Sequence, residues 1–260
     1  MKEQHTHSHR ELELLTALRR LGGSARSADL AKLLDVSEET VRRVIKSLSK
    51  SGSVERVHGG AYIAGTHSDP SFFRRIAQHA GEKRVIAAGI ASEIDDGMTV
   101  FLDVGSTTAF VAEELRARRQ LTVVTNSIGV AQTLVSHNSN RVHFLGGEMQ
   151  SDERGTFGHV TRQQARRFAC DVGMLSVDAV SAKRGFLYEN AAEAALAEVV
   201  AECSETLVVG MDHFKFNEKA PHCGMTPERV DRVYTDIEPT GALAASLREW
   251  GIKVVRCGAA

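Results

Sequence analysis

Residues 37–61 read SEETVRRVIKSLSKSGSVERVHGGA. Ser37 is a residue type that commonly caps a helix N-terminus, and the two glutamates after it complement the helix dipole in the first turn. Apolar residues then recur at positions 41, 44, 45 and 48, which is the spacing of one buried helix face. The basic residues between them fall on the opposite face. The stretch therefore predicts a helix that packs on a core with one side and presents positive charge on the other.

Two further helices are expected before this basic helix. Ser8 and Glu11 have the spacing of a capping box, and the leucines at 14, 15, 18 and 21 form an apolar stripe that ends at Gly22-Gly23. A second short helix fits Ser27–Leu34, with its leucines on one side. Together with the basic helix, these patterns predict the three helices of a helix-turn-helix domain.

A small hairpin follows the basic helix. Two β-like pieces, Val54–Val57 and Ala61–Ile63, flank His58-Gly59-Gly60. A basic face is most often only a solvated surface, but here the helix spacing, the caps and the hairpin all agree with a winged helix-turn-helix DNA-binding domain over residues 1–63. We expect its DNA contacts to come from the exposed side chains of the basic helix and the hairpin: Ser37, Thr40, Arg42, Arg43, Lys46, Ser47, Lys50, Arg56 and His58.

The composition supports a globular protein that carries its positive charge at one end. The chain has 260 residues, 42% of them hydrophobic and 25% charged. Residues 1–63 hold 11 Lys+Arg and 8 Asp+Glu, a balance of +3; the remainder holds 21 and 25, a balance of −4, and the two give the net −1. No apolar run approaches the roughly 18 residues of a membrane span, and the polar N-terminus shows no secretory signal. Four widely spaced cysteines favour reduced thiols over a zinc framework. We therefore expect a cytoplasmic protein.

The rest of the chain predicts an α/β domain. Residues 64–72 are rich in small and turn-forming residues and are expected to be a linker. A helix is expected from Phe73 to about Ile94, at the start of an effector domain over 73–260. Beyond it, apolar runs alternate with helical patterns, which predicts a Rossmann-like, mostly parallel sheet. The expected strands are Met98–Leu102, Leu121–Thr125, Val142–Leu145, Val172–Val177, Leu207–Val209, Arg232–Thr235 and Lys253–Val255. The expected helices are Thr108–Arg118, Ile128–Ser136, Arg162–Phe168 and Ala191–Cys203.

Small or polar residues follow most of these strands, and ligands of such sheets bind at the carboxyl ends of the strands. The first strand ends in Asp103-Val104-Gly105-Ser106-Thr107-Thr108. Its glycine, its hydroxyls and the N–H groups of a helix start suit a phosphate. The lysine of a Walker loop is missing, so nucleotide hydrolysis is not expected. An ordinary capped helix start would also explain this stretch, and the same holds for a single polar residue after any one strand.

The combination resembles the DeoR family of bacterial regulators. The likeness runs from about residue 10 to 257. It rests on residues 37–61, on Arg75 and Glu82-Lys83, on the motif at 103–108, on Thr125-Asn126-Ser127 and Gly146-Gly147 after the next two strands, and on Asp212-His213-Phe214-Lys215-Phe216. The resemblance implies an effector domain related to ribose-5-phosphate isomerase that binds phosphorylated sugars. It further implies a repressor of a carbohydrate-catabolic operon, released from operator DNA by such a metabolite.

Carried over position by position, the resemblance implies an effector site. Hydroxyls at 106–108 would hold a phosphate, basic side chains would add positive charge, and carboxylates and amides would meet sugar hydroxyls. The residues expected to line the site are Arg75, Lys83, Asp103, Gly105, Ser106, Thr107, Thr108, Asn126, Ser127, Gly146, Gly147, Asp178, Glu193, Asp212 and Lys215. No metal and no cofactor are expected, and the partners are operator DNA, the effector and further copies of the chain in a dimer or tetramer.

The chain departs from the family pattern at two places. Arg42-Arg43 is followed by Val44-Ile45, where the family commonly has Asp-Leu. Ala197 stands where many members carry a basic residue, and Tyr188-Glu189-Asn190 nearby suits a different pocket. These departures affect base preference and the charge of the ligand.

Two other functional classes, an enzyme and a metal-responsive repressor, remain open from the residues alone. Asp178 and Glu193 are carboxylates that an isomerase would use as acid and base, which would make the chain a sugar-phosphate isomerase with an accessory DNA-binding module. Sites that only bind sugars need the same carboxylates, so a regulator without enzymatic activity is the favoured reading. His5, His7 and His9 would suit a metal-responsive repressor, but a short histidine tract in a polar tail is more often no site at all.

Overall fold

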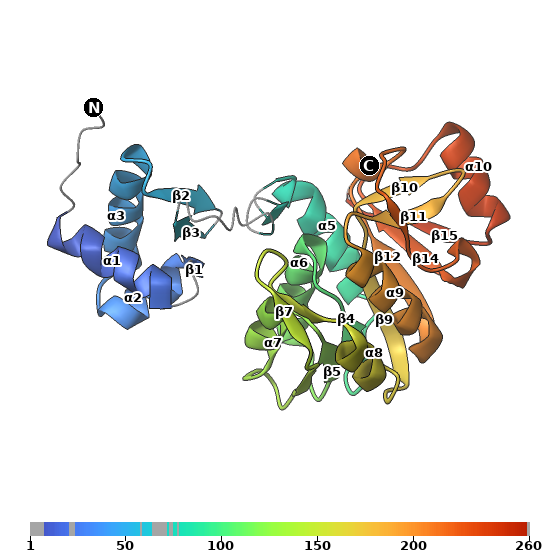
Figure 1. The fold of residues 1–260 in the computed structure, drawn as a ribbon, viewed down its shortest axis with the longest axis horizontal. Helices are drawn as coiled ribbons and strands as arrows, with labels where there is room; N and C mark the ends of the chain where they lie inside the picture. Colours follow the sequence, from blue (N-terminus) through green and yellow to red (C-terminus); the bar gives the residue numbers. More distant parts are fainter. Residues whose placement is uncertain are drawn as a thin grey trace. The chain divides into compact units, whose positions relative to one another are not determined.

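The computed structural model describes residues 8–20, 24–57, 59–63, 72, 75, 76, 78 and 79–258. The chain divides into two compact units, residues 1–78 and 79–260 (Figure 1). The predicted domain limits at 63 and 73 stay predictions, because residues 64–71 lie outside the described part of the chain.

The N-terminal unit is a three-helix domain with a small antiparallel sheet. Its helices are α1 (His9–Arg20), α2 (Ser27–Leu34) and α3 (Glu38–Lys50). Its strands are β1 (Ser24–Arg26), β2 (Val54–Val57) and β3 (Gly60–Ile63), in the order β1-β3-β2. Leucines and β-branched residues of the three helices form one core, which includes Leu18, Leu30, Val41, Ile45 and Leu48. The winged helix predicted from the sequence is confirmed, and β1 is the one strand of this unit that was missed.

Both predicted caps are present. Ser8 and Glu11 exchange hydrogen bonds as a capping box, from the Ser8 N–H to the Glu11 carboxylate and from the Glu11 N–H to the Ser8 hydroxyl. The Ser37 hydroxyl accepts from the Thr40 N–H at 3.2 Å, a contact typically worth about 1 kcal/mol. α2 ends where Asp35 takes a left-handed conformation with φ 50°. The turn before α3 is therefore fixed by backbone geometry on one side and by a cap on the other.

The C-terminal unit is built on a seven-stranded sheet in which every pairing is parallel. The strand order is β15-β14-β12-β9-β4-β5-β6. The bounds are β4 (Thr99–Leu102), β5 (Thr122–Thr125), β6 (Arg141–Phe144), β9 (Cys170–Ser176), β12 (Ser204–Gly210), β14 (Arg232–Thr235) and β15 (Lys253–Arg256). The chain runs outward from β4 to β6 and then returns to β9 on the other side of β4. The order therefore reverses between β4 and β9, the place where such sheets bind ligands.

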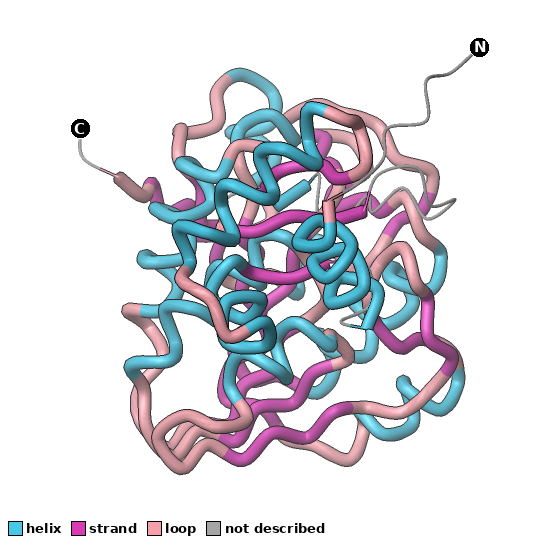
Figure 2. The backbone as a smooth tube through the Cα atoms, turned by 90° about the vertical axis from the view of Figure 1, so that its left-hand side faces the viewer, coloured by secondary structure: helices cyan, strands magenta, loops and turns pink. Residues whose placement is uncertain are grey.

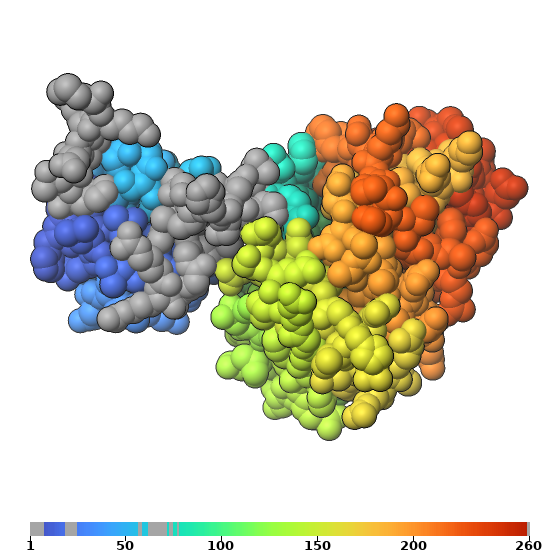
Figure 3. Space-filling model, in the orientation of Figure 1, coloured from blue at the N-terminus to red at the C-terminus, as the bar shows by residue number. Residues whose placement is uncertain are grey.

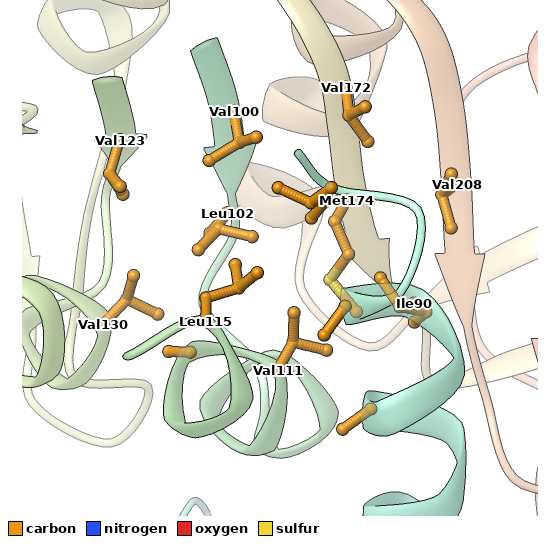
Figure 4. Packing of buried hydrophobic residues seen from close by; sticks show 14 of the residues in the cluster. Ile90, Val100, Leu102, Val111, Leu115, Val123, Val130, Val172, Met174 and Val208 are labelled. Carbon is orange, nitrogen blue, oxygen red and sulfur yellow. The ribbon is translucent and has the colours of Figure 1, made fainter. Parts of the chain in front are cut away.

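Helices cover the two faces of this sheet (Figure 2). The helices of the unit are α5 (Ala80–Ala91), α6 (Ser106–Glu114), α7 (Ile128–Leu134), α8 (His159–Ala165), α9 (Ala191–Cys203) and α10 (Gly241–Glu249). Alternate strand residues decide which face each helix meets. Val100 and Leu102 join the cluster under α5, α6 and α7 (Figure 4), whereas Leu175 on the other face lines a cavity with Leu196 of α9. The predicted α/β fold with a parallel sheet is confirmed.

Smaller elements complete the C-terminal unit. β7 (Glu148–Gln150) and β8 (Gly155–Phe157) form a hairpin. β10 (Ala179–Ser181), β11 (Gly185–Tyr188) and β13 (His222–Cys223) form a second small sheet. Short 3-10 turns lie at η1 (Leu115–Ala117), η2 (His213–Lys215) and η3 (Pro227–Arg229). The sequence analysis predicted none of the strands in this group, and it also missed α10.

One predicted helix is wrong in extent. A continuous helix from Phe73 to about Ile94 was expected, but α5 begins only at Ala80. His79, just before it, has φ 54°, a left-handed conformation that interrupts any helix running in from the N-terminal side. The apolar pattern of 73–94 gave no sign of this break, because periodicity does not report the backbone conformation of a single residue. α5 is therefore a helix of the second unit alone.

Replacing Leu102 with alanine is expected to lower the free energy of unfolding of the C-terminal unit by about 2–5 kcal/mol, because the side chain is fully buried in the main cluster (Figure 4). Denaturant unfolding followed by circular dichroism measures this. Val135→Ala is the control: Val135 is 58% exposed, and its truncation is expected to change stability by no more than about 0.5 kcal/mol. Equal effects of the two changes would contradict the assigned core.

Candidate DNA-binding and effector sites

The exposed face of α3 carries the predicted basic residues. Arg42, Arg43, Lys46 and Lys50 are all exposed, while Val41, Ile45 and Leu48 are buried on the other side of the helix. Arg56 on β2 is exposed as well. The helix thus offers a row of cations, the footprint expected for phosphate and base contacts.

Contacts within the unit already engage some of these side chains. Arg42 pairs with Glu38 at 2.8 Å, an exposed ion pair that DNA phosphates can displace at little cost. The Ser47 hydroxyl donates to the Glu11 carboxylate at 2.6 Å and so ties α3 to α1. Thr40 shares a hydrogen bond with the Ser37 hydroxyl at the start of α3. Ser37, Thr40 and Ser47 therefore hold and orient the helix, and His58 lies outside the described residues.

The effector-site candidates gather at the carboxyl edge of the sheet, as expected for parallel strands. Asp103 follows β4, Asn126 follows β5, Asp178 follows β9 by two residues, and Asp212 follows β12 by two. β4 and β9 are hydrogen-bonded neighbours at the reversal of the strand order. The side chains at these two strand ends therefore occupy the ligand-binding position of the fold.

Asp103 joins the ends of β4 and β9. Its carboxylate accepts from the Ser176 N–H at 2.8 Å, from the Ser176 hydroxyl at 3.4 Å and from the Thr108 hydroxyl. Burial raises the pKa of Asp103 to about 7, although these hydrogen bonds and the charge of Lys215 pull the pKa down. Lys215 donates its ammonium to the carbonyl of Val177. The strand ends are thus held by one buried carboxyl with a lysine in electrostatic reach.

The loop from Gly105 to Thr108 leads straight into α6. A Cβ on Gly105 would overlap the Ser176 hydroxyl, so only glycine lets β4 and β9 end this close together. The three hydroxyl residues are buried, and Thr108 is engaged by Asp103. The Thr107 hydroxyl has no hydrogen-bond partner among the described residues. A phosphate at this loop would therefore rely on backbone N–H groups at the helix start together with Thr107.

A small cavity lies beside Asp103, on the face covered by α9. Its lining is Asp103, Val104, Asn126, Phe157, Leu175, Tyr188, Glu193, Leu196 and Ala197. With a volume of about 10 Å³ it holds about one water molecule, so a sugar ring would have to enlarge it or bind above it. Burial raises the pKa of Tyr188, and the charges of Asp103, Glu193 and Asp178 raise it further. These four side chains therefore lie within electrostatic reach of one another.

Several expected site residues have clear structural contacts. The Asn126 amide donates to the Thr156 carbonyl at 3.1 Å, and its carbonyl oxygen has no partner in the described ranges. Ser127 caps α7 by accepting from the Val130 N–H. The Gly146 N–H donates to Gln164 at 2.7 Å.

Gly147 and Asp178, two further residues expected in the site, also have structural roles. Gly147 has φ 142°, and a Cβ there would overlap Thr161. Ser127, Gly146 and Gly147 therefore shape the turns around the site. Asp178 accepts from the Glu189 N–H at 2.9 Å, which holds β9 and β11 together at their ends.

Asp212 and the basic candidates complete the set. Asp212 is 1% exposed, and neither of its carboxyl oxygens has a hydrogen-bond partner among the described residues. Lys83 of α5 is also buried. Arg75 is half-buried and belongs to the first unit, whose placement against the second is not determined. Asp212 is therefore a buried acidic group whose carboxyl oxygens accept no hydrogen bond from the described residues.

The sequence analysis missed several residues of this edge. Ser176 binds Asp103, and Phe157 reaches the cavity from the β7–β8 hairpin. Gln150 of that hairpin accepts from the Asn190 amide at 2.6 Å and so joins it to the start of α9. His213 pairs with Asp236, Nδ1 to Oδ2, at 2.5 Å. Signals were present in the sequence at Tyr188-Glu189-Asn190 and, for His213, in the 212–216 motif. Ser176, Phe157 and Gln150 became neighbours of the site through strand order, which the sequence does not show.

Two searches over the described residues bear on other functions. No helix there is long and apolar enough to cross a membrane. No three His, Cys, Asp or Glu side chains of that part gather in a way that would hold a metal ion, and His5 and His7 lie outside it.

The raised pKa of Asp103 predicts a pH-dependent stability. The folded state binds this proton more tightly than the unfolded state, whose pKa is near 3.8. The contribution of Asp103 is therefore complete below about pH 4 and is lost as the pH rises through about 7. Relative to Asp103→Asn, the free energy of unfolding of the wild type should fall over this range, by at most about 1.4 kcal/mol per pH unit.

Denaturant unfolding at several pH values measures this difference. Asp95→Asn, at an exposed position, is the matched control and should follow the wild type. Parallel pH profiles of wild type and Asp103→Asn would contradict the raised pKa.

Comparison with known proteins identifies the family to which both units belong. A family model described as a DeoR-like helix-turn-helix domain matches residues 10–66, and one described as the DeoR C terminal sensor domain matches residues 78–237. The glycerol-3-phosphate regulon repressor of Escherichia coli (strain K12) is 29% identical over 235 residues, 90% of this chain and 93% of that protein. The HTH-type transcriptional repressor CsqR of the same strain is 31% identical over 247 residues, 95% of this chain and 94% of its own.

Two further likenesses are partial. The lactose phosphotransferase system repressor of Streptococcus mutans is 35% identical over 154 residues, 58% of this chain and 61% of that protein. The solved ribose 5-phosphate isomerase A of Neisseria gonorrhoeae overlaps 53% of each chain at 17% identity with a TM-score of 0.39, which is too low to support a conclusion. The two family matches cover both units, and the full-length relatives are repressors. The chain belongs to the DeoR family of DNA-binding transcriptional regulators.

Proposed function

We propose that this protein represses a carbohydrate operon and leaves its operator when a phosphorylated sugar binds at the carboxyl edge of the parallel sheet. The observation that carries the effector part is Asp212, a buried carboxyl whose two oxygens have no partner among the described residues. Buried polar groups are normally hydrogen-bonded, so such a group at a ligand-binding edge marks a place for ligand hydroxyls.

The chemistry around it fits a sugar phosphate. Carboxylates at the ends of β4, β9 and β12 suit hydroxyl groups, while Lys215 and the start of α6 suit a phosphate. The relatives named for glycerol-3-phosphate and for lactose phosphotransfer support this class of ligand. The protein would act in the cytoplasm as a homo-oligomer, with paired winged helices on repeated or inverted half-sites.

Release of DNA requires differential affinity. The sugar phosphate must bind more tightly to an arrangement of the protein that does not bind DNA. Enzymatic turnover is not needed for this, and an isomerase assay on pentose and hexose phosphates is expected to show none. Sustained conversion of a substrate by the purified protein would contradict this. It would indicate that Asp178 and Glu193 act as catalytic acid and base and do not only bind a ligand.

Replacing Lys46 with alanine is expected to weaken DNA binding because one phosphate contact is lost. The plot of log K against log salt, whose slope is negative, should become less steep by about one unit. A duplex selected by the wild type from a random pool serves as the operator, and fluorescence anisotropy at several salt concentrations gives the slope. Lys32→Ala, an exposed lysine of α2, is the control and should leave the slope unchanged. Identical slopes for Lys46→Ala and the wild type would remove α3 from the DNA interface.

A phosphorylated sugar at 100 times its Kd is expected to add about 2.7 kcal/mol to the stability of the wild type. A thermal-shift panel would hold glycerol 3-phosphate, pentose phosphates and hexose phosphates, each beside its unphosphorylated form, and inorganic phosphate. Asp212→Asn should abolish the shift without lowering the Tm of the free protein, because no hydrogen bond from a described residue to its carboxyl is lost.

Asp95→Asn is the matched control for this panel and should keep the full shift. If only unphosphorylated sugars stabilise the protein, the proposal of a sugar-responsive regulator stands, but the proposal that its effector carries a phosphate is wrong. A full shift in Asp212→Asn would place the ligand elsewhere.

A further inference from the structure

A column of three aromatic rings runs from the effector edge to the first residue of the C-terminal unit. Phe214 contacts two histidines: its ring centroid is 3.8 Å from that of His79, stacked at 21°, and 4.0 Å from that of His213, tilted at 34°. His213 is anchored to Asp236 by its ring and by its backbone N–H, at 2.5 and 2.9 Å. The column therefore connects the loops after β12 and β14 to the start of α5.

The three residues of η2 serve three different contacts. His213 is held by Asp236, Phe214 stacks on His79, and Lys215 donates to the Val177 carbonyl at the end of β9. η2 is a single turn, closed by the N–H of Lys215 on the Asp212 carbonyl and that of Phe216 on the His213 carbonyl. A displacement of Lys215 therefore displaces Phe214, its immediate neighbour.

His79 stands at the point where the chain leaves the N-terminal unit. It is the first residue of the second unit and has a left-handed backbone with φ 54°, a conformation that costs energy for a residue with a side chain. Its side chain makes no cap hydrogen bond to α5. The contact that the structure shows for the His79 ring is its stack on Phe214, so this stack supports the strained residue.

The stack is not part of the hydrophobic core. Phe214 is 49% exposed, and His79 is exposed too. A large aromatic side chain at such a position contributes little to folding, yet it contacts His79, the left-handed residue at which the second unit begins.

We propose that Phe214 and His79 form the contact through which occupancy of the Lys215 and Asp212 edge reaches the DNA-binding unit. This inference rests on the proposed effector site. A sugar phosphate that takes the Lys215 ammonium from the Val177 carbonyl moves η2, shifts Phe214 and frees His79 from its strained conformation. The direction of the segment before α5 then changes, and with it the spacing of the winged helices. Both histidines and Phe214 act as positioning residues and touch no ligand.

The first experiment needs no ligand. In NMR spectra of the full-length protein, the His79 ring protons are shifted by the ring current of Phe214, and His79→Gln assigns their signals. Lys215→Met removes the ammonium and keeps the stem, and it is expected to move the His79 signals toward those seen in Phe214→Leu. Ile237→Ala, at an exposed position after β14, is the control and should leave them in place. Unchanged His79 signals in Lys215→Met would overturn the coupling.

The second experiment measures release. We divide the operator Kd measured with the sugar phosphate that stabilises the wild type by the Kd measured without it. This ratio is determined for the wild type, Phe214→Leu, His79→Gln and the double variant. We expect each single variant to keep sugar-phosphate and DNA binding but to lower the ratio at least five-fold, and the double variant to lower it no further, since both changes break one contact. Wild-type ratios in the single variants, or additive losses in the double variant, would refute the proposal. A panel without any phosphorylated hit would instead refute the proposed effector, while the NMR result on His79 would still stand.

Discussion

The parallel pairing of β4 with β9 is the constraint on which the effector unit depends. At the end of this pair the backbone ladder stops, and the Asp103 carboxyl continues it by accepting from the N–H of Ser176, two residues past Met174, the last β9 residue paired with β4. A side chain thus replaces a backbone carbonyl at the reversal of the strand order. The arrangement requires a glycine at 105, since any larger residue would meet Ser176.

This arrangement buries the Asp103 carboxyl, which costs free energy when the group is ionised. The raised pKa of Asp103 reflects that desolvation cost. Hydrogen bonds from Ser176 and Thr108 offset part of the desolvation. A buried titratable group at the end of β4 and the unpartnered carboxyl of Asp212 after β12 agree with the polar ligand proposed for this edge.

Much of the fold was predictable because strands and helices of this chain carry strong local signals. The seven strands of the sheet were placed to within three residues, and α9 and β14 were placed at their observed bounds. Capping residues such as Ser37 located α3. Elements of two or three residues, such as β1, β7 and β13, escaped prediction because so short a stretch has no measurable periodicity. The break at His79 escaped because a left-handed residue leaves no mark on the hydrophobic pattern.

The candidate site was predictable in part for the same reason. Residues that follow strands, such as Asn126 and Asp178, are found from the sequence because parallel strands end at one edge. The partners of those residues are not. Ser176 meets Asp103, and Gln150 meets Asn190, only because the strand order reverses and a hairpin folds across the edge. Relations of this kind depend on topology, which the local pattern of a single sequence does not contain.

The energies of the Phe214–His79 contact are of the size that the proposed coupling requires. Allosteric coupling between two ligands typically amounts to about 1–3 kcal/mol. An aromatic pair contributes about 0.5–1.5 kcal/mol beyond its buried area, and a left-handed residue with a side chain stores energy of the order of 1–3 kcal/mol. The stack of Phe214 on His79 joins both quantities at one residue. Breaking the stack costs its stabilisation, whereas relaxation of His79 returns strain energy of similar size, so the balance between the two arrangements falls within the range of allosteric coupling.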